Sequence, residues 1–360
     1  MVLFKVVASF PIMQDEEEAV VYLRKSGIAR AAKAAGREAR EGVIAVSISS
    51  DEAQCTAVML NCETDFVQKN PKFVAFSRAL AEHCRSTLQP DDITPSLGAR
   101  ESALIEQLKS SRPSYNLSSC VQRDSTAPAN SVNELLADLT TQFGEKVEVS
   151  AVECMGSDAS SCIGVYVHNE ATPGVGVGRA AAMVELRWDL SSTSATPATV
   201  LRERLSKFAR LMAMQVVASS PKFVDLNSIP SSTVEEERSI AEETSKAAAA
   251  AGTKGAAEPK DSSASETKET MPSKIAAQRM QRYLQEQCLV FQEFLMIKQL
   301  YNDVLSDIQA ETATQSTGSR SSSKTNNQPI TVADALQLVG KTLGCTLTVS
   351  RMRLITVGSQ

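Results

Sequence analysis

A strand that runs into a short bend and then into a helix is the feature that most constrains this chain. Residues 54–60 (Gln-Cys-Thr-Ala-Val-Met-Leu) are apolar and β-branched, which is typical of a strand. Asn70 and Pro71 supply a polar N-cap followed by proline at the first helical position. Between them lies an elbow, residues 61–67, which carries Asp65 and Phe66. We therefore expect an acid and a large aromatic side chain at a rigid, exposed bend.

Phe66 allows two interpretations. Pointing outward, a phenylalanine on a stiff bend offers a partner protein a large apolar area at little cost in conformational entropy. Pointing inward, it would pack against its own helix, as isolated aromatic residues usually do. The residues of the elbow alone do not decide between the two.

The first half of the chain has an α+β pattern. After helices over 15–41, residues 43–48 alternate as a strand with Ile44, Val46 and Ile48 on one face, and 49–52 turn it back into 54–61 as an antiparallel hairpin. The helix 71–85 is expected to bury its apolar face in the core. That face consists of Phe73, Phe76, Leu80 and Cys84. Further helices at 101–110 and 132–143 and a strand at 146–154 complete this half.

A second half begins near residue 160. It is expected to contain strands 162–168 and 180–188, the helix 199–218, and two helices at 234–246 and 273–287. The intervening stretch 247–271 is rich in Ala, Ser, Thr, Lys and Glu, and we expect it to be mobile. The two helices are interpreted as a projecting hairpin, with a flexible linker holding one incidental helix as the alternative. A polar stretch at 311–328 is expected to be a disordered insertion.

Composition excludes several function classes. A net charge of −5 argues against binding a nucleic-acid backbone, and no apolar run approaches the length of a membrane span. The eight cysteines lack a Cys-x-x-Cys pair and are interpreted as reduced, mostly buried thiols. His83 and His168 are the only histidines and lie far apart in sequence, which makes a zinc site improbable. We therefore expect no cofactor and no metal.

The candidate catalytic motifs in this sequence lack residues or a context that their chemistry requires. Gly340-Lys341-Thr342 imitates the end of a phosphate-binding loop, but Ala335 stands where that loop needs glycine. The glycine-rich run 174–178 precedes a strand, whereas phosphate cradles lead into a helix, so we interpret it as a loose hairpin turn. Neither a Gly-x-Ser-x-Gly nor a His-Glu-x-x-His motif is present. We expect the protein not to be an enzyme.

The segment 60–67, Leu-Asn-Cys-Glu-Thr-Asp-Phe-Val, resembles the signature of elongation factor Ts, the nucleotide-exchange factor of bacterial and organellar translation. Further similar segments, on both sides of this one, occur in the same order as in that family over about residues 15–360. They are 23–27, 33–42, 164–169, 178–186, 213–223, 272–276 and 331–340, with a terminal strand at 346–357.

The resemblance implies an α+β fold: a two-part core of small antiparallel sheets packed with helices, a helical N-terminal remnant, and a projecting coiled-coil-like hairpin. The implied domains are 1–42 (remnant of a ubiquitin-associated-like domain), 43–155, 156–232, 233–288 (the hairpin) and 289–360. Of the family's N-terminal domain, only the last helix, near 15–26, is recognisable.

By resemblance, the partner is the GTPase elongation factor Tu, from which the protein would release GDP so that GTP can enter. Phe66 would wedge into the partner's nucleotide domain, Asp65 would fix the elbow or pair with the partner, and His168 with the helix 213–220 would form a second contact. The implied contact residues are Thr64, Asp65, Phe66, Val67, His168, Met214 and Gln215. Gln215 replaces a family histidine, which removes a titratable group. Alternatives are a scaffold without exchange activity and, more remotely, a thiol- or nucleotide-dependent enzyme.

The expected location is an organelle, a mitochondrion or alternatively a plastid. The first thirteen residues are apolar with one lysine and no arginine, which suits neither a mitochondrial presequence nor a secretory signal. We therefore expect the targeting segment to lie upstream of Met1. Self-association through the hairpin is left open.

Overall fold

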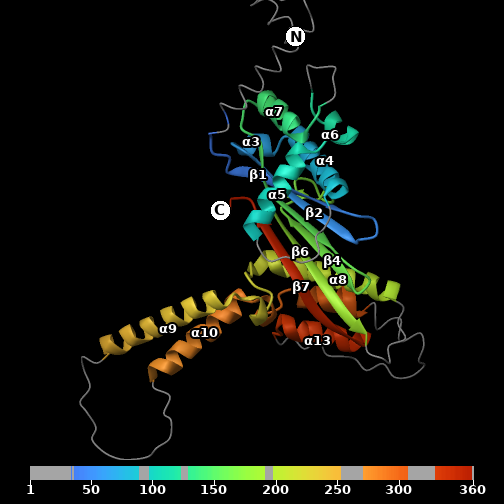
Figure 1. Ribbon diagram of the computed structural model, residues 1–360. Coiled ribbons are helices and arrows are strands. Elements are labelled where there is room, and N and C mark those ends of the chain that lie inside the picture. Colours follow the sequence, from blue (N-terminus) through green and yellow to red (C-terminus); the bar gives the residue numbers. More distant parts are fainter. Residues whose placement is uncertain are drawn as a thin grey trace, which may run out of the picture. The chain divides into compact units, whose positions relative to one another are not determined.

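The computed structural model describes residues 34, 36–88, 97–122, 129–190, 198–252, 271–306 and 329–358 (Figure 1). The helices expected before residue 34, most of the expected mobile stretch 247–271 and the expected insertion 311–328 lie outside these residues. The chain divides into two compact units. Unit 1 comprises residues 1–186, 198–217 and 352–360, and unit 2 comprises residues 187–197 and 218–351.

The fold is α+β, as the sequence predicts. The strands are β1 Glu41–Ile48, β2 Gln54–Cys62, β3 Glu148–Gly156, β4 Ser161–His168, β5 Val177–Gly178, β6 Ala180–Leu190 and β7 Cys345–Thr356. The α-helices are α3 Asp65–Gln68, α4 Pro71–Thr87, α5 Leu97–Ser110, α6 Tyr115–Ser119, α7 Val132–Phe143, α8 Ala198–Ser219, α9 Ser231–Gly252, α10 Met271–Gln287, α11 Ile297–Gln299 and α13 Val332–Leu343. Short 3₁₀ turns lie at Leu226–Ser228 and Leu289–Phe291, and a π-helical turn lies at Leu300–Leu305.

The first sheet has the strand order β3-β2-β1-β5. β1 and β2 form the expected antiparallel hairpin, in register from Glu41 opposite Cys62 to Ile48 opposite Cys55. β3 pairs antiparallel with the other side of β2. The glycine-rich run adds β5, which pairs with β1 at Ile44 and Ala45, so this run extends the sheet and is more than a loose turn.

Both faces of this sheet are buried, whereas the sequence suggested one apolar face for β1. Val43 and Ala45 belong to the cluster that packs under α4, α5 and α7, while Ile44 contributes to a second cluster that includes residues of β4 and β6. The expected core face of α4 is confirmed, because Phe73, Phe76, Leu80 and Cys84 are all fully buried. The Asn70 side chain accepts the Lys72 N–H, which confirms the predicted N-cap before Pro71.

The second sheet has the strand order β4-β6-β7. α8 lies directly against β4, and this close approach depends on the absence of a side chain at Gly164. A Cβ at this glycine would stand 2.0 Å from the carbonyl carbon of Ala209 in α8, so no larger residue fits without moving the helix. β4, β6, α8 and β7 match the expected elements at 162–168, 180–188, 199–218 and 346–357.

Within unit 2, α9 and α10 lie side by side as a helical pair (Figure 1, yellow and orange). Ala241 of α9 is buried at their contact, where Ile240, Met280 and Tyr283 line a small cavity of about 90 Å³. α9 extends to Gly252, six residues beyond the predicted end, because the alanine-rich run 247–252 continues the helix. In the part of the chain that the structure describes, no helix is both long enough and apolar enough to cross a membrane.

Candidate functional site

The elbow folds into a single helical turn, α3, between β2 and α4. Phe66 on this turn is 82% exposed, whereas its neighbour Val67 is only 8% exposed and belongs to the core cluster. The turn therefore directs one apolar side chain inward and presents the next one to solvent. This confirms the outward interpretation of Phe66 and excludes packing against its own helix.

A carboxylate from a distant segment holds the start of the elbow. Both the backbone N–H and the hydroxyl of Thr64 donate to Glu145, at 3.0 Å (N to Oε2) and 2.6 Å (Oγ1 to Oε1). In return, Glu63 accepts the backbone N–H of Lys146 at 2.6 Å and pairs with Arg37 at 3.1 Å. The Lys146 N–H, followed by Arg37, lowers the pKa of the Glu63 carboxyl. These reciprocal contacts join the elbow to the loop between α7 and β3.

Asp65 forms an ion pair within its own helical turn. Its carboxylate lies 2.7 Å from Lys69 Nζ, one helical turn away, and this hydrogen bond lowers the pKa of Asp65. Both side chains are largely exposed, so the pair adds little to stability. In this structure Asp65 pairs within the turn, and its role toward a partner stays a prediction.

Gln68, the residue directly after the elbow, is held by Arg179, which lies between β5 and β6. Its Nη1 donates to the Gln68 side-chain oxygen at 2.7 Å and to Glu41 at 2.6 Å. Gln68 is the last residue of α3 and is buried, so its amide has a fixed orientation. Sequence reasoning missed Glu145, Gln68 and Arg179, because their contacts join residues far apart in the chain.

His168 lies exposed at the end of β4. Its Nδ1 shares a hydrogen bond of 3.2 Å with the Tyr166 hydroxyl, and its backbone carbonyl accepts the Arg179 N–H at 3.0 Å. Asn169 follows in a left-handed conformation with φ of 53°, which turns the chain sharply. Arg179 thus contacts both the elbow and the histidine turn.

One of the two expected contacts on α8, Gln215, needs correction. Gln215 is fully buried, so its side chain does not reach a partner from this conformation. Met214 is half-buried. The reason is that α8 turns this part of its surface toward the core, where Met212, Ala213 and Val216 are also fully buried. Gln215, for which the resemblance implies a histidine in the family, therefore lies inside the protein and not on its surface.

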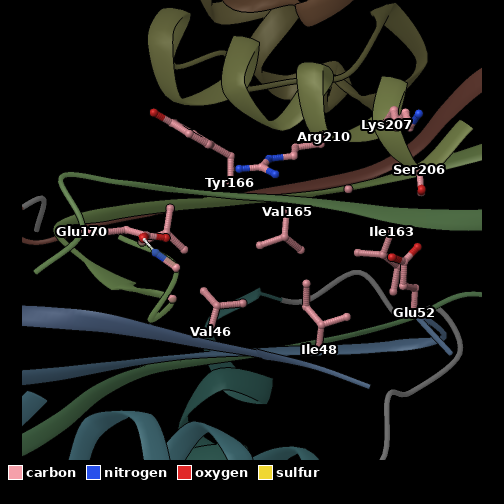
Figure 2. Close-up of a pocket in the computed structure, with 14 residues that line it drawn as sticks. Val46, Ile48, Glu52, Ile163, Val165, Tyr166, Glu170, Ser206, Lys207 and Arg210 are labelled. Atoms are coloured by element: carbon pink, nitrogen blue, oxygen red, sulfur yellow. Dashed lines mark hydrogen bonds between the residues drawn. The ribbon is translucent and has the colours of Figure 1, made fainter. Parts of the chain in front are cut away.

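A pocket of about 370 Å³ lies between β1, β4 and α8 (Figure 2). Figure 2 shows Val46 and Ile48 facing Ile163 and Val165 across the opening, with charged residues of both signs at its rim. These are Glu52, Glu170, Lys207 and Arg210. None of the seven contact residues expected from the sequence lines it.

The cysteines are free, and six of the eight are buried, as expected. Burial raises the pKa of the Cys62 and Cys162 thiols to about 12, which keeps them protonated and poorly nucleophilic. The described residues contain no cluster of three His, Cys, Asp or Glu side chains suited to a metal ion.

Comparison with known proteins decides the family. A sequence model described as Elongation factor TS matches residues 63–317, more than half of the chain. The chain belongs to the elongation factor Ts family. It is 31% identical over 282 residues to elongation factor Ts of Prosthecochloris aestuarii, which covers 78% of this chain and 77% of that protein. Elongation factor Ts of Anaplasma marginale is 30% identical, with 78% of each chain covered.

Elongation factor Ts of Chlorobium limicola is also similar, at 29% identity over 81% of this chain and 82% of that protein. These similarities support a role as a translation elongation factor of the Ts type. The family match begins at Glu63, inside the elbow that presents Phe66.

Proposed function

We propose that this protein binds the GTPase elongation factor Tu and accelerates the release of GDP, so that GTP can replace it. Family membership supports the choice of partner. The observation that carries the mechanism is the 82% exposure of Phe66 on a turn whose neighbouring residues are tied down at both ends.

The thermodynamic basis is reciprocal coupling. A protein that binds the nucleotide-free GTPase more tightly than its GDP form must weaken GDP binding by the same factor. Phe66 would enter the partner's nucleotide domain between two helices and displace the elements that hold Mg²⁺ and the β-phosphate. Since a bound divalent cation is among the largest local charges in such a site, its displacement weakens GDP strongly.

The elbow is suited to this role because it needs no rearrangement. Thr64 is held by Glu145 and Gln68 is held by Arg179, so the ring projects from a turn fixed on both sides. A preorganised aromatic side chain loses little conformational entropy on binding, which leaves more of its contact energy for the partner. His168 and Met214 are proposed as further contacts, with Thr64, Asp65 and Val67 shaping the elbow.

The proposal is tested by the release of fluorescent GDP from elongation factor Tu in a stopped-flow instrument. Addition of the wild-type protein should accelerate release, and Phe66→Ala should reduce this acceleration by more than about tenfold, as expected for a central aromatic contact. Tyr115 on α6 provides a matched control, because it is an equally exposed aromatic residue at 86%. Tyr115→Ala should leave the rate unchanged.

Two results would contradict the proposal. Phe66→Ala that accelerates release as well as the wild type would exclude the wedge. A wild-type protein that binds elongation factor Tu without accelerating release would instead support a scaffold.

We further propose a mitochondrial location, with a plastid as the alternative. Fractionation of the source cells, followed by detection of the protein with an antibody, tests this directly. Recovery of the protein outside both organelles would overturn the proposal.

A further inference from the structure

Arg179 contacts both of the segments proposed to bind the partner. Its guanidinium donates to Gln68 at 2.7 Å, two residues after Phe66, and its backbone N–H donates to the carbonyl of His168 at 3.0 Å. A second acceptor, Glu41 in β1, lies 2.6 Å from the same Nη1. One residue therefore links the elbow, the first sheet and the histidine turn.

The backbone at this position is fixed from two sides. Its carbonyl accepts the Val357 N–H at 3.0 Å, opposite the bond to His168. The preceding Gly178 allows the close approach, since a Cβ there would stand 2.5 Å from the His168 carbonyl oxygen. A residue with a side chain would push the two segments apart and lengthen the Arg179–His168 bond.

We propose that Arg179 is a positioning residue that keeps the Phe66 turn and the His168 turn at one fixed spacing. This inference rests on the proposed function. When two contacts on a rigid body engage one partner, displacement at the first is transmitted to the second. When the connection is loose, each contact binds independently and the partner is not distorted.

Arginine suits this geometry, in which one guanidinium nitrogen, Nη1, donates to both Gln68 and Glu41. Its planar guanidinium holds two acceptors in fixed directions, whereas the lysine ammonium is a point charge on a flexible stem. Arg179→Lys should therefore restore the charge but only part of the positioning. Gln68→Leu removes the elbow's half of the link and leaves the Arg179–Glu41 pair in place.

A control pair exists in the same unit. Arg353 Nε lies 3.3 Å from Glu153 Oε2, and the two side chains are 33% and 21% exposed, compared with 40% and 35% for Arg179 and Glu41. Arg353 Nη1 also donates to the carbonyl oxygen of Met352 at 2.9 Å, so these two contacts of the guanidinium lie outside the elbow and outside His168. Arg353→Met thus removes a comparable ion pair without touching the proposed link.

The first measurement is hydrogen–deuterium exchange of the segment 61–69 in the free, full-length protein. Arg179→Met and Gln68→Leu should each accelerate exchange of this segment by about tenfold, while Arg353→Met should leave it unchanged. Gln68→Leu keeps the test valid even if Arg179→Met does not fold. Unchanged exchange in Gln68→Leu would overturn the inference.

The second measurement is a double-mutant cycle on GDP release from elongation factor Tu. In the wild-type background, the effects of Phe66→Ala and His168→Ala should be strongly non-additive, and in the Arg179→Met background they should become additive. If the non-additivity survives in Arg179→Met, Arg179 is not the link, and the proposed function stands. If Phe66→Ala has no effect in any background, the proposed function fails and this inference fails with it.

Discussion

Replacing Glu145 by glutamine should loosen the elbow without unfolding the protein. The two carboxylate oxygens of Glu145 accept the hydroxyl and the backbone N–H of Thr64 at 2.6 and 3.0 Å. A glutamine at this position retains one oxygen that can accept the backbone N–H, and its NH₂ group can donate to the Thr64 hydroxyl oxygen, but the negative charge is removed. Both hydrogen bonds therefore become neutral, and the one to the hydroxyl reverses its direction.

The size of the effect follows from these contacts. Hydrogen bonds to charged groups contribute about 1.5–3 kcal/mol when buried, and Glu145 is only half-buried, so we expect a loss of about 1–2 kcal/mol. Since a tenfold change corresponds to about 1.4 kcal/mol, exchange of the elbow amides should accelerate about 5- to 30-fold. The midpoint of global unfolding should change less, because the core under α4 is untouched.

Hydrogen–deuterium exchange followed by mass spectrometry of the peptide 61–69 measures this directly. Glu148→Gln is the control, since Glu148 lies three residues from Glu145 and its carboxylate pairs with Lys146 at 2.8 Å. The reasoning is refuted if Glu145→Gln exchanges like the wild type. It is also refuted if Glu148→Gln accelerates the elbow to the same extent.

Two further predictions concern stability. Phe73→Ala should lower the free energy of unfolding by about 3–5 kcal/mol because Phe73 is fully buried, whereas Phe66→Ala should change it by less than about 0.5 kcal/mol. Urea unfolding measures both values, and equal losses for the two variants would show that Phe66 is packed. Glu63 has a pKa lowered below its ordinary 4.5, so its stabilisation is fully present above that pH and is lost as the pH falls through the folded-state value. The difference in unfolding free energy between the wild type and Glu63→Gln should therefore shrink from neutral pH to about pH 3, and a difference that does not depend on pH would contradict this.

The secondary structure around the elbow could be predicted because the residues that determine it lie next to one another in the sequence. The apolar run of β2, the Asn70 cap and Pro71 each act within a few residues, and the structure confirms all three. The outward direction of Phe66 could be stated only as one of two alternatives. It became definite once Val67 was found to occupy the inward position of the same turn.

The contacts that make the elbow rigid could not be predicted. Thr64 and Glu145 are 81 residues apart, and Gln68 and Arg179 are 111 residues apart. No periodicity or spacing connects such pairs, since they meet only after the sheets have formed. The short strand β5 was missed for a related reason, because it is defined by its pairing with β1 and not by its own two residues.

The burial of Gln215 shows a different limit. A polar residue in a helix suggests a surface position, yet the orientation of α8 is set by its close contact with Gly164 of β4. The face of α8 that points inward depends on that contact and not on the polarity of one side chain.

The affinity of the protein for elongation factor Tu, with and without GDP, tests the central claim most directly. The wild type should bind the nucleotide-free GTPase more tightly than the GDP form. Phe66→Ala should lose about 2–4 kcal/mol, or about 30- to 700-fold, in affinity for the nucleotide-free form and little for the GDP form. An equal loss for both forms, or no loss for either, would contradict the claim that this exposed ring drives GDP release.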